Sequence, residues 1–424
     1  MSAIPPPLPA VDRDRTLVRV AAVVLALTLF LLPIGRVSEL GVLGSIVISA
    51  LLIARFGLRP LKSPTVTLLL ALFACYAVPA WVSLIGAVDF ERSFVSALSD
   101  LRFLPLALMS ILILRERTPL YRSIMGISGL IVAVWALDAW IQGITGFGLA
   151  GALDSDRVSG VFGDGNLKLG PVLAVLSPLL LEEVRRRYGR GFFALAWLLL
   201  AVAILLAGAR AGWIMYALVT LVMLWRIALK PSLFVAWLAA SAVAIGALGL
   251  VTYQLNPLFA ERVERTLSVG DGSVDAIDYA LAGRLPIWQT AVRMSLDNPL
   301  NGVGVRGFRE AYPRYADADD PWVSADRSQG ALHPHHVGLE LSSELGLVGL
   351  LAWLIGGVLA LRAWWRASRA ARDRAFAPGL ALLVMLFPLN THFAFYSSFW
   401  GLLLWWLVAL WCAGLSERAQ DNPR

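Results

Sequence analysis

Long apolar stretches recur along this chain from one end to the other, and they constrain its fold more than any other feature. A helix of about 20 apolar residues spans the hydrocarbon core of a bilayer, which is roughly 30 Å thick. Twelve candidate segments are present, near residues 17–34, 40–54, 65–86, 94–114, 119–144, 166–183, 191–207, 211–226, 232–253, 336–361, 375–394 and 397–415. The sequence therefore predicts an all-α polytopic membrane protein with about twelve transmembrane helices.

The composition supports the same fold class. Hydrophobic residues make up 58% of the chain, whereas charged residues make up only 15%. A soluble core could not bury that much apolar surface. We therefore expect membrane lipids to be the main surroundings of the helices.

Basic residues gather in alternate connections between the predicted helices. If the N-terminal segment is cytoplasmic, one side of the membrane collects Arg13, Arg15, Arg55, Arg59, Lys62, Arg115, Arg117, Arg122, the run RRRYGR at 185–190, Arg226, Lys230 and the arginines of 362–374. This is the positive-inside pattern of membrane proteins. The net charge of +7 thus reflects topology, and no nucleic-acid partner is expected.

The predicted topology divides the chain into five parts. Residues 1–16 are expected to be a disordered cytoplasmic tail, 17–253 to hold helices one to nine, 254–335 to form one large loop on the opposite side, 336–415 to hold helices ten to twelve, and 416–424 to be a second cytoplasmic tail. A loop of roughly eighty residues usually carries function. Its apolar periodicity predicts an amphipathic helix over residues 283–296.

Several arginines on the loop side are candidates for binding an anion. Arg210 joins two apolar segments close to membrane depth, where a cation needs an anionic partner such as a lipid-linked phosphate. The alternative is an arginine that snorkels to the headgroups. Arg284 opens the amphipathic helix and could equally be a surface charge. Arg265 lies among glutamates, so a local ion pair is the simpler interpretation there.

A glycine-rich segment, RVSGVFGDGNLKLGP, precedes the sixth predicted helix. Arg157 begins this segment, and Asn166 lies just before the helix. Backbone N–H groups at a helix N-terminus favour anions, although the spacing of these glycines is not that of a phosphate-binding loop. The segment therefore adds Arg157 to the candidate cations.

Three of the four histidines lie in the string HPHH at 333–336, where the large loop meets the tenth predicted helix. Imidazoles so close together could bind a metal, but no cysteine or helix-spaced second histidine accompanies them. They could also be interfacial residues that stabilise the loop. The third possibility is an acid/base histidine, since imidazole accepts a proton near neutral pH.

The string HPHHVGLELSSELGLVG is similar to the signature of the O-antigen ligase and O-antigen polymerase superfamily of bacterial membrane glycosyltransferases. In that signature a His-Asn pair is followed by Leu, Glu and Gly at fixed spacings. Counted from His335, these residues are Leu339, Glu344 and Gly346. The resemblance places His335 at the family's catalytic position. His336 stands where asparagine is usual and is the second candidate, with His333 in support.

Three further segments resemble the same family. GRLPIWQTAVRMSLDNPLNGVGVRGF places Arg284 and Trp288 on matched positions, and GARAGW places Arg210 on the family's arginine. GVFGDGNLKLG resembles the family's segment around Asn166. The resemblance covers most of the chain from about residue 157 to residue 400.

The resemblance implies a GT-C-like O-antigen ligase in the bacterial inner membrane, with its active site facing the periplasm. It would transfer O-antigen polysaccharide from undecaprenyl pyrophosphate to a sugar hydroxyl of lipid A–core, with inversion and without metal or cofactor. The implied site comprises His335 or His336 as base, Arg210, Arg284, Arg265 and Arg157 as ligands of the donor pyrophosphate, and His333, Asn166, Trp288 and Glu344 as supporting residues.

Other functions remain open at this point. An O-antigen polymerase or a protein O-oligosaccharyltransferase would belong to the same superfamily, while the length and motifs look more like those of ligases. A lipid-glycan transporter is a different class. Transporters usually show related halves and ionisable residues near the bilayer midplane, whereas here most unpaired charges fall on one face beside one large loop.

Overall fold

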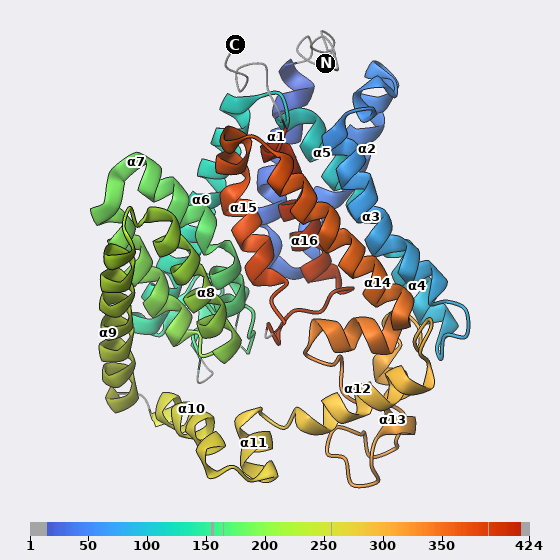
Figure 1. Ribbon diagram of the computed structural model, residues 1–424, viewed down its shortest axis with the longest axis vertical. Helices are drawn as coiled ribbons and strands as arrows, with labels where there is room; N and C mark the ends of the chain where they lie inside the picture. Colours follow the sequence, from blue (N-terminus) through green and yellow to red (C-terminus); the bar gives the residue numbers. More distant parts are fainter. Residues whose placement is uncertain (1–14, 154–156, 164, 256, 389, 417–424) are drawn as a thin grey trace.

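The computed structural model describes residues 15–153, 157–163, 165–255, 257–388 and 390–416. Within these residues the regular structure is helical apart from one short hairpin (Figure 1). The α-helices are α1 (Arg15–Phe30), α2 (Glu39–Phe56), α3 (Pro64–Val82), α4 (Phe90–Asp100), α5 (Phe103–Leu114), α6 (Thr118–Thr145), α7 (Leu169–Leu206), α8 (Arg210–Ile227), α9 (Pro231–Leu255), α10 (Pro257–Leu267), α11 (Val274–Ala280), α12 (Leu285–Asp297), α13 (Phe308–Tyr315), α14 (Val337–Arg366), α15 (Arg369–Met385) and α16 (Ser398–Gly414). The hairpin pairs β1 (Phe147–Gly148) with β2 (Gly151–Ala152), and the 3-10 segments are η2 (Leu32–Ser38), η3 (Arg59–Leu61), η4 (Gly160–Phe162) and η5 (Ser268–Asp271).

The all-α polytopic character expected from the sequence is confirmed. Within the described residues, eight helical segments are long and apolar enough to cross a membrane. They are Leu32–Phe56, Pro64–Val82, Phe90–Leu114, Thr118–Thr145, Leu169–Leu206, Arg210–Ile227, Pro231–Gln254 and Val337–Arg366. The count of twelve crossings stays a prediction, because α1, α15 and α16 have only 16, 17 and 17 residues. The expected tails lie almost entirely in residues 1–14 and 417–424, outside the described residues.

Two helices change direction at glycines in the left-handed region. The sixth and seventh predicted segments form α7, which breaks at Gly189 with φ of 83°. In α14 the break falls at Gly346, with φ of 63°. Left-handed backbone angles are accessible to glycine at little steric cost. Each break therefore has a local cause in the sequence.

The connections rich in arginine gather at one end of the helices, at the top in Figure 1. Arg226 at the end of α8 lies 3.1 Å from Asp373 of α15 and 3.6 Å from Glu182 of α7. The Tyr121 hydroxyl of α6 donates to the Arg374 carbonyl oxygen at 3.1 Å. These contacts bring distant basic connections together, as the positive-inside pattern requires.

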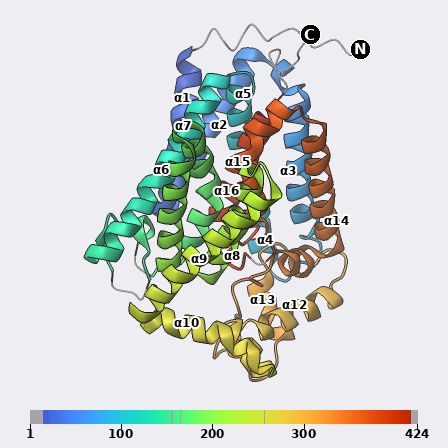
Figure 2. The same ribbon diagram turned by 60° about the vertical axis from the view of Figure 1, so that its left-hand side comes forward.

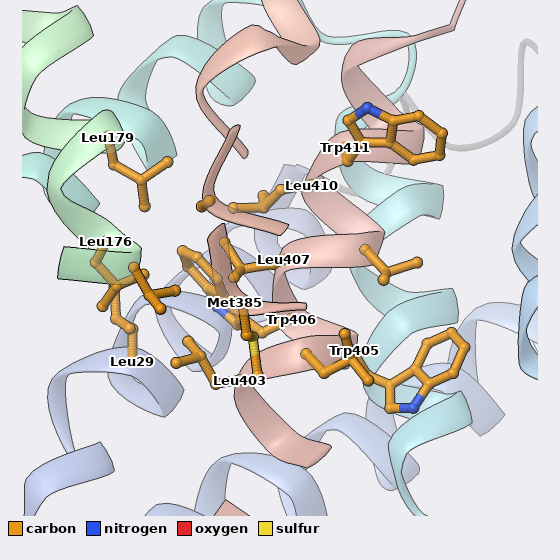
Figure 3. Packing of buried hydrophobic residues seen from close by; sticks show 14 of the residues in the cluster. Leu29, Leu176, Leu179, Met385, Leu403, Trp405, Trp406, Leu407, Leu410 and Trp411 are labelled. Carbon is orange, nitrogen blue, oxygen red and sulfur yellow. The ribbon is translucent and has the colours of Figure 1, made fainter. Parts of the chain in front are cut away.

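The centre of the bundle is α16, which is apolar on all sides and almost wholly buried. Figure 3 shows Trp406 and Leu407 of this helix among side chains of neighbouring helices, including Leu29 and Leu176. The Trp406 indole N–H donates to the Leu25 carbonyl oxygen at 3.1 Å, so its one polar atom has a partner. A helix that is hydrophobic all round is expected at such a buried position.

The large loop folds into a helical layer, α10 to α13, at the end of the molecule opposite the arginine-rich connections (Figures 1 and 2). The predicted amphipathic helix is confirmed as α12, which buries Ile287, Ala291 and Met294. These residues recur at helical spacing and pack with Phe308 and Tyr312 of α13. The loop thus has a hydrophobic core of its own, which gives its arginines fixed positions.

One predicted helix boundary is wrong. The eleventh apolar segment was expected to run over 375–394, but α15 ends at Met385 and the following residues form an irregular loop before α16. Pro388 explains the early end, because proline disfavours helical angles in the residue before it and clashes with a continuing helix. The loop of residues 386–397 returns beneath the bundle and contributes directly to the site described next.

Candidate functional site

The histidine segment lies at the N-terminus of α14 and is held there by the amphipathic helix. The Trp288 indole N–H of α12 donates to the Pro334 carbonyl oxygen at 3.0 Å. His335 adopts φ of 55°, which is uncommon for a residue with a side chain. The backbone therefore turns sharply at His335, and the next residue begins the helix.

His336 acts as the N-cap of α14. Its Nδ1 atom accepts a hydrogen bond from the backbone N–H of Leu339 at 3.3 Å. Asparagine is among the best N-cap residues because its side-chain oxygen accepts the same kind of bond. His336 Nδ1 thus caps α14 by the same kind of hydrogen bond that an asparagine side chain would accept.

His335 has a different partner. Its Nδ1 atom lies 2.7 Å from the Thr391 carbonyl oxygen, in the loop of residues 386–397. A carbonyl can only accept, so Nδ1 carries the hydrogen and Nε2 keeps its lone pair. Burial, with a smaller contribution from the Arg284 charge, lowers the pKa of His335 to about 4. The imidazole is therefore neutral near pH 7, with Nε2 able to accept a proton.

The other two histidines surround this base. His333 accepts the backbone N–H of His335 at its Nδ1 atom, at 3.3 Å, and the two rings lie 4.0 Å apart between centroids. His392 is buried, and within the described residues its Nδ1 atom has no hydrogen-bond partner. Burial, with the Arg284 charge next in size, lowers the pKa of His392 to about 3. Three neutral imidazoles thus lie together.

His392 was not among the residues singled out from the sequence as site members. The signal was present in LNTHFAF, a polar interruption between two apolar segments. The predicted topology put His392 on the same face as the other histidines, but the family signature gave no reason to choose it. Only the early end of α15 places it beside His335.

Arg284 lies close to these histidines, at the position that precedes α12. Burial, followed by the charges of Arg210 and Arg265, lowers the pKa of Arg284 to about 10. Its carbonyl oxygen accepts the Trp288 backbone N–H at 3.0 Å, but within the described part of the chain its guanidinium forms no hydrogen bond and no ion pair. A partly buried guanidinium without a carboxylate is costly unless an anion from outside binds to it.

Arg210 and Arg265 are held near Arg284 by backbone carbonyls. Arg210, the first residue of α8, donates to Thr266 Oγ1 at 3.2 Å and to the carbonyl oxygen of Ala280. Arg265 donates from Nε to the Tyr279 carbonyl oxygen at 2.6 Å, and its guanidinium lies 4.5 Å from the centroid of the Tyr279 ring.

The local ion pair that was the simpler interpretation for Arg265 is absent from the described residues. Neighbouring Glu264 instead accepts a hydrogen bond from the Tyr253 hydroxyl at 2.8 Å. Arg265 is therefore available to an anion on its remaining guanidinium nitrogens, as are Arg210 and Arg284.

Arg157 approaches the same region from the glycine-rich segment. A Cβ atom on Gly208 would lie 3.2 Å from Arg157 Cγ and 2.7 Å from Arg262 Nη1, so both arginines pack against the link that precedes Arg210. The Arg157 charge also contributes to the low pKa of His392. The four arginines that the sequence singled out thus lie near one another, and the charges of Arg284 and Arg157 reach His392.

Asn166 has a local role. Its side-chain oxygen accepts the Lys168 backbone N–H at 3.1 Å, and its amide donates to the Phe162 carbonyl oxygen at 3.3 Å. Lys168 then lies 4.7 Å from the Phe399 ring centroid, at the start of α16. Asn166 therefore shapes the turn that leads into α7, and among the described residues no hydrogen bond joins its side chain to the arginines or histidines.

Glu344 braces the loop against α14. Its Oε2 atom accepts the Arg306 backbone N–H at 2.8 Å, and its carbonyl oxygen accepts the Gly304 N–H at 3.0 Å. Beyond the break at Gly346, the Leu347 N–H donates to the Pro299 carbonyl oxygen at 2.8 Å. The NPLNGVG segment is therefore fixed to the helix that carries the histidines.

Glu340 performs a similar task that sequence reasoning did not assign. One carboxylate oxygen accepts the Phe395 backbone N–H at 2.8 Å and lies 3.5 Å from the Tyr396 nitrogen. This contact holds the loop of residues 386–397, and with it the Thr391 carbonyl, against α14. The available signal was an ionisable residue within an apolar helix, which needs a partner inside the protein.

A metal site receives little support from this arrangement. Within the described residues, no three His, Cys, Asp or Glu side chains are grouped so that they could hold a metal ion. The nitrogens of His333, His335 and His336 named above are already engaged with the protein backbone. Each of these contacts uses Nδ1, so His335 keeps its Nε2 atom as an acceptor near Arg284.

Comparison with known families agrees with this arrangement. The model of the O-antigen ligase family matches residues 194–354, which include Arg210, Arg284 and the histidine segment. No curated protein matches the chain significantly. Residues 194–354 are thus similar to the O-antigen ligase family, in a chain with eight described helical segments long and apolar enough to cross a membrane.

Proposed function

We propose that this protein is an O-antigen ligase of the bacterial inner membrane. It transfers O-antigen polysaccharide from undecaprenyl pyrophosphate to a sugar hydroxyl of lipid A–core on the periplasmic side. The observation that carries the proposal is the hydrogen bond of His335 Nδ1 to the Thr391 carbonyl, at 2.7 Å. It leaves Nε2 as an acceptor near Arg284, whose side chain has no carboxylate partner among the described residues.

In the proposed reaction the acceptor hydroxyl gives its proton to His335 Nε2. The hydroxyl oxygen then bonds to the anomeric carbon of the donor sugar, and the bond from that carbon to the pyrophosphate oxygen breaks. The electron pair leaves with undecaprenyl pyrophosphate, so the new glycosidic bond has inverted configuration. A positioned base of this kind contributes about 10² to 10⁴ in rate.

The arginines stabilise the charge that develops on the leaving group. Pyrophosphate is a multiply charged anion. Guanidinium groups are planar and bind its oxygens with paired hydrogen bonds. Arg284 and Arg210 are the main ligands in this proposal, with Arg265 and Arg157 beside them. No metal or nucleotide cofactor takes part, because four guanidinium groups supply the positive charge.

Donor binding also prepares the base. In the free protein the Arg284 charge contributes to the low pKa of His335. A bound pyrophosphate places negative charge next to Arg284, which offsets that effect and raises the pKa of His335. The base therefore becomes stronger when the donor is present.

The proposal is tested with the purified protein in lipid vesicles, supplied with undecaprenyl-pyrophosphate-linked O-antigen and rough lipopolysaccharide. We expect the lipid A–core band to shift to higher mass on a gel. Extension of the lipid-linked glycan without modification of lipid A–core would contradict ligase activity and indicate a polymerase. Movement of donor across the vesicle membrane without a new glycosidic bond would indicate a transporter.

A further inference from the structure

A polar cavity of about 480 Å³ lies beside α4, apart from the arginines that are proposed to bind the donor. Side chains from three separate parts of the chain line it, among them Glu91, Ser96, Ser99, Asp100, Arg306 and Tyr396. A volume of this size is in the usual range for small-ligand sites, which runs from about 300 to 1,000 Å³. Neither the histidines nor the four donor arginines line this cavity.

The walls of the cavity are fixed to the helix that carries the catalytic histidine. Arg306 donates its backbone N–H to Glu344, and the Tyr396 backbone lies against Glu340. The Tyr396 hydroxyl is also anchored, because it donates to the Tyr76 carbonyl oxygen at 2.8 Å. Both walls therefore keep a constant position relative to the N-terminus of α14.

The chemistry of the lining suits hydroxyl groups better than phosphates. Asp89, Glu91 and Asp100 supply three carboxylates against the two guanidinium groups of Arg92 and Arg306, so the formal charge is negative by one. Carboxylates only accept hydrogen bonds and guanidinium groups only donate them, whereas a sugar hydroxyl does both. A lining that mixes carboxylates, guanidinium groups and hydroxyls can bind several neighbouring sugar hydroxyls.

The cavity and the arginine group have separate linings, and both have a charge that acts on His333. Burial lowers the pKa of His333 well below its ordinary value, and the charges of Arg306 and Arg284 both act in the same direction. His333 therefore lies within reach of Arg306 in the cavity and of Arg284 in the arginine group. In Figure 1 the two flanking helices are widely separated, with α4 at the right and α8 at the left.

An inverting displacement requires this kind of separation. The attacking hydroxyl and the leaving pyrophosphate must lie on opposite faces of the anomeric carbon. If pyrophosphate occupies the arginines, the acceptor has to reach His335 from the other side. The polar cavity has no lining residue in common with the arginine group, and its walls are bonded to α14, so it is a candidate for the acceptor.

We propose that this cavity is the subsite for the sugar residues of the acceptor, which are held by Glu91, Asp100, Arg306 and Tyr396 while one hydroxyl is presented to His335. The inference rests on the proposed ligase function, because it assigns the second substrate of the same site. It names the substrate by its chemistry, a neutral polyhydroxyl glycan segment.

The test compares two tryptophan substitutions on α4 in the purified full-length protein. Ser96→Trp fills the cavity, whereas Leu98→Trp adds the same side chain at a residue that is 50% exposed and does not line it. Two probes are used, and the binding of each is measured by titration calorimetry. One is soluble core oligosaccharide released from rough lipopolysaccharide, and the other is inorganic pyrophosphate. Glu91→Gln serves as a second variant that keeps the size of the side chain.

We expect Ser96→Trp to weaken oligosaccharide binding at least about tenfold and Glu91→Gln about threefold, with pyrophosphate binding unchanged in both. Leu98→Trp is expected to bind like the wild type. Oligosaccharide binding that is equal in Ser96→Trp, Glu91→Gln and wild type would overturn the proposal, as would a wild type that binds no oligosaccharide. Because binding is measured without turnover, these outcomes are distinct from an absence of transfer activity, which would instead refute the ligase function.

Discussion

The Nδ1 atom of His335 lies 2.7 Å from the carbonyl oxygen of Thr391, a residue 56 positions further along the chain. This contact fixes the tautomer of the imidazole, while His336 beside it is engaged as the helix cap. Two adjacent histidines thus have separate tasks. The distinction leads directly to a first experiment.

His335→Ala should lower kcat by about 10² to 10⁴, because the imidazole that accepts the hydroxyl proton in the proposed reaction is removed. His336→Asn should keep activity within about threefold, because the asparagine oxygen can cap α14 in place of the imidazole. Transfer kinetics with both substrates measure the difference. Full activity in His335→Ala, or total loss in His336→Asn with a folded protein, would reverse the assignment.

Arg284 and Arg293 provide a matched pair on the same helix segment. Arg293 is ion-paired with Asp317 at 2.9 Å, whereas Arg284 has no such partner among the described residues. Arg284→Gln should weaken binding of undecaprenyl pyrophosphate about ten- to hundredfold, because a desolvated guanidinium is removed from the anion. Arg293→Gln should change it less than twofold. Equal effects of the two substitutions on binding would contradict a donor site at Arg284.

Stability should fall with acid in a way that depends on His392. Its pKa is lowered to about 3, and that of His335 to about 4, whereas an unfolded histidine has a pKa of about 6.5. Between these values the unfolded state binds more protons, so the stabilising effect is complete above pH 6.5 and is lost as the pH falls toward 4. His392→Gln should therefore flatten the fall in Tm over this range. If Tm falls with pH as steeply in His392→Gln as in the wild type, His392 is not buried in its neutral form.

The break in α14 should depend strictly on glycine. Gly346 has φ of 63°, and a Cβ atom there would overlap the Leu300 carbonyl group. Gly346→Ala is expected to destabilise the protein by about 3 kcal/mol or more, because both backbone strain and a steric clash arise. Gly357→Ala, in the same helix with open space around it, should be neutral or slightly stabilising. Thermal unfolding in detergent compares them, and similar midpoints would disprove the tight contact between Gly346 and the NPLNGVG segment.

Transfer should continue in the presence of EDTA. Four arginines supply the positive charge that a divalent ion would otherwise provide to the pyrophosphate. The measurement is the rate of lipid A–core modification before and after chelation. A loss that Mg²⁺ or Mn²⁺ restores would refute the metal-independent mechanism.

The sequence determined the helical character of the chain and the general location of the site. Apolar segments long enough to cross a bilayer predicted helices, and the spacing of Ile287, Ala291 and Met294 predicted the buried face of α12. A resemblance to a family signature singled out His335, Arg210 and Arg284 as candidates. These features are local, since they depend on residue types at fixed spacing within one segment.

Tertiary structure alone decided which atoms of these residues are free to react. The partner of His335 comes from a loop whose existence depends on the early end of α15, and Glu340 holds that loop in place. His392 and Arg306 enter the site through the same long-range packing. Spacing in the sequence cannot reveal such contacts, because whether a buried polar atom is satisfied depends on which distant backbone group the folded chain brings to it.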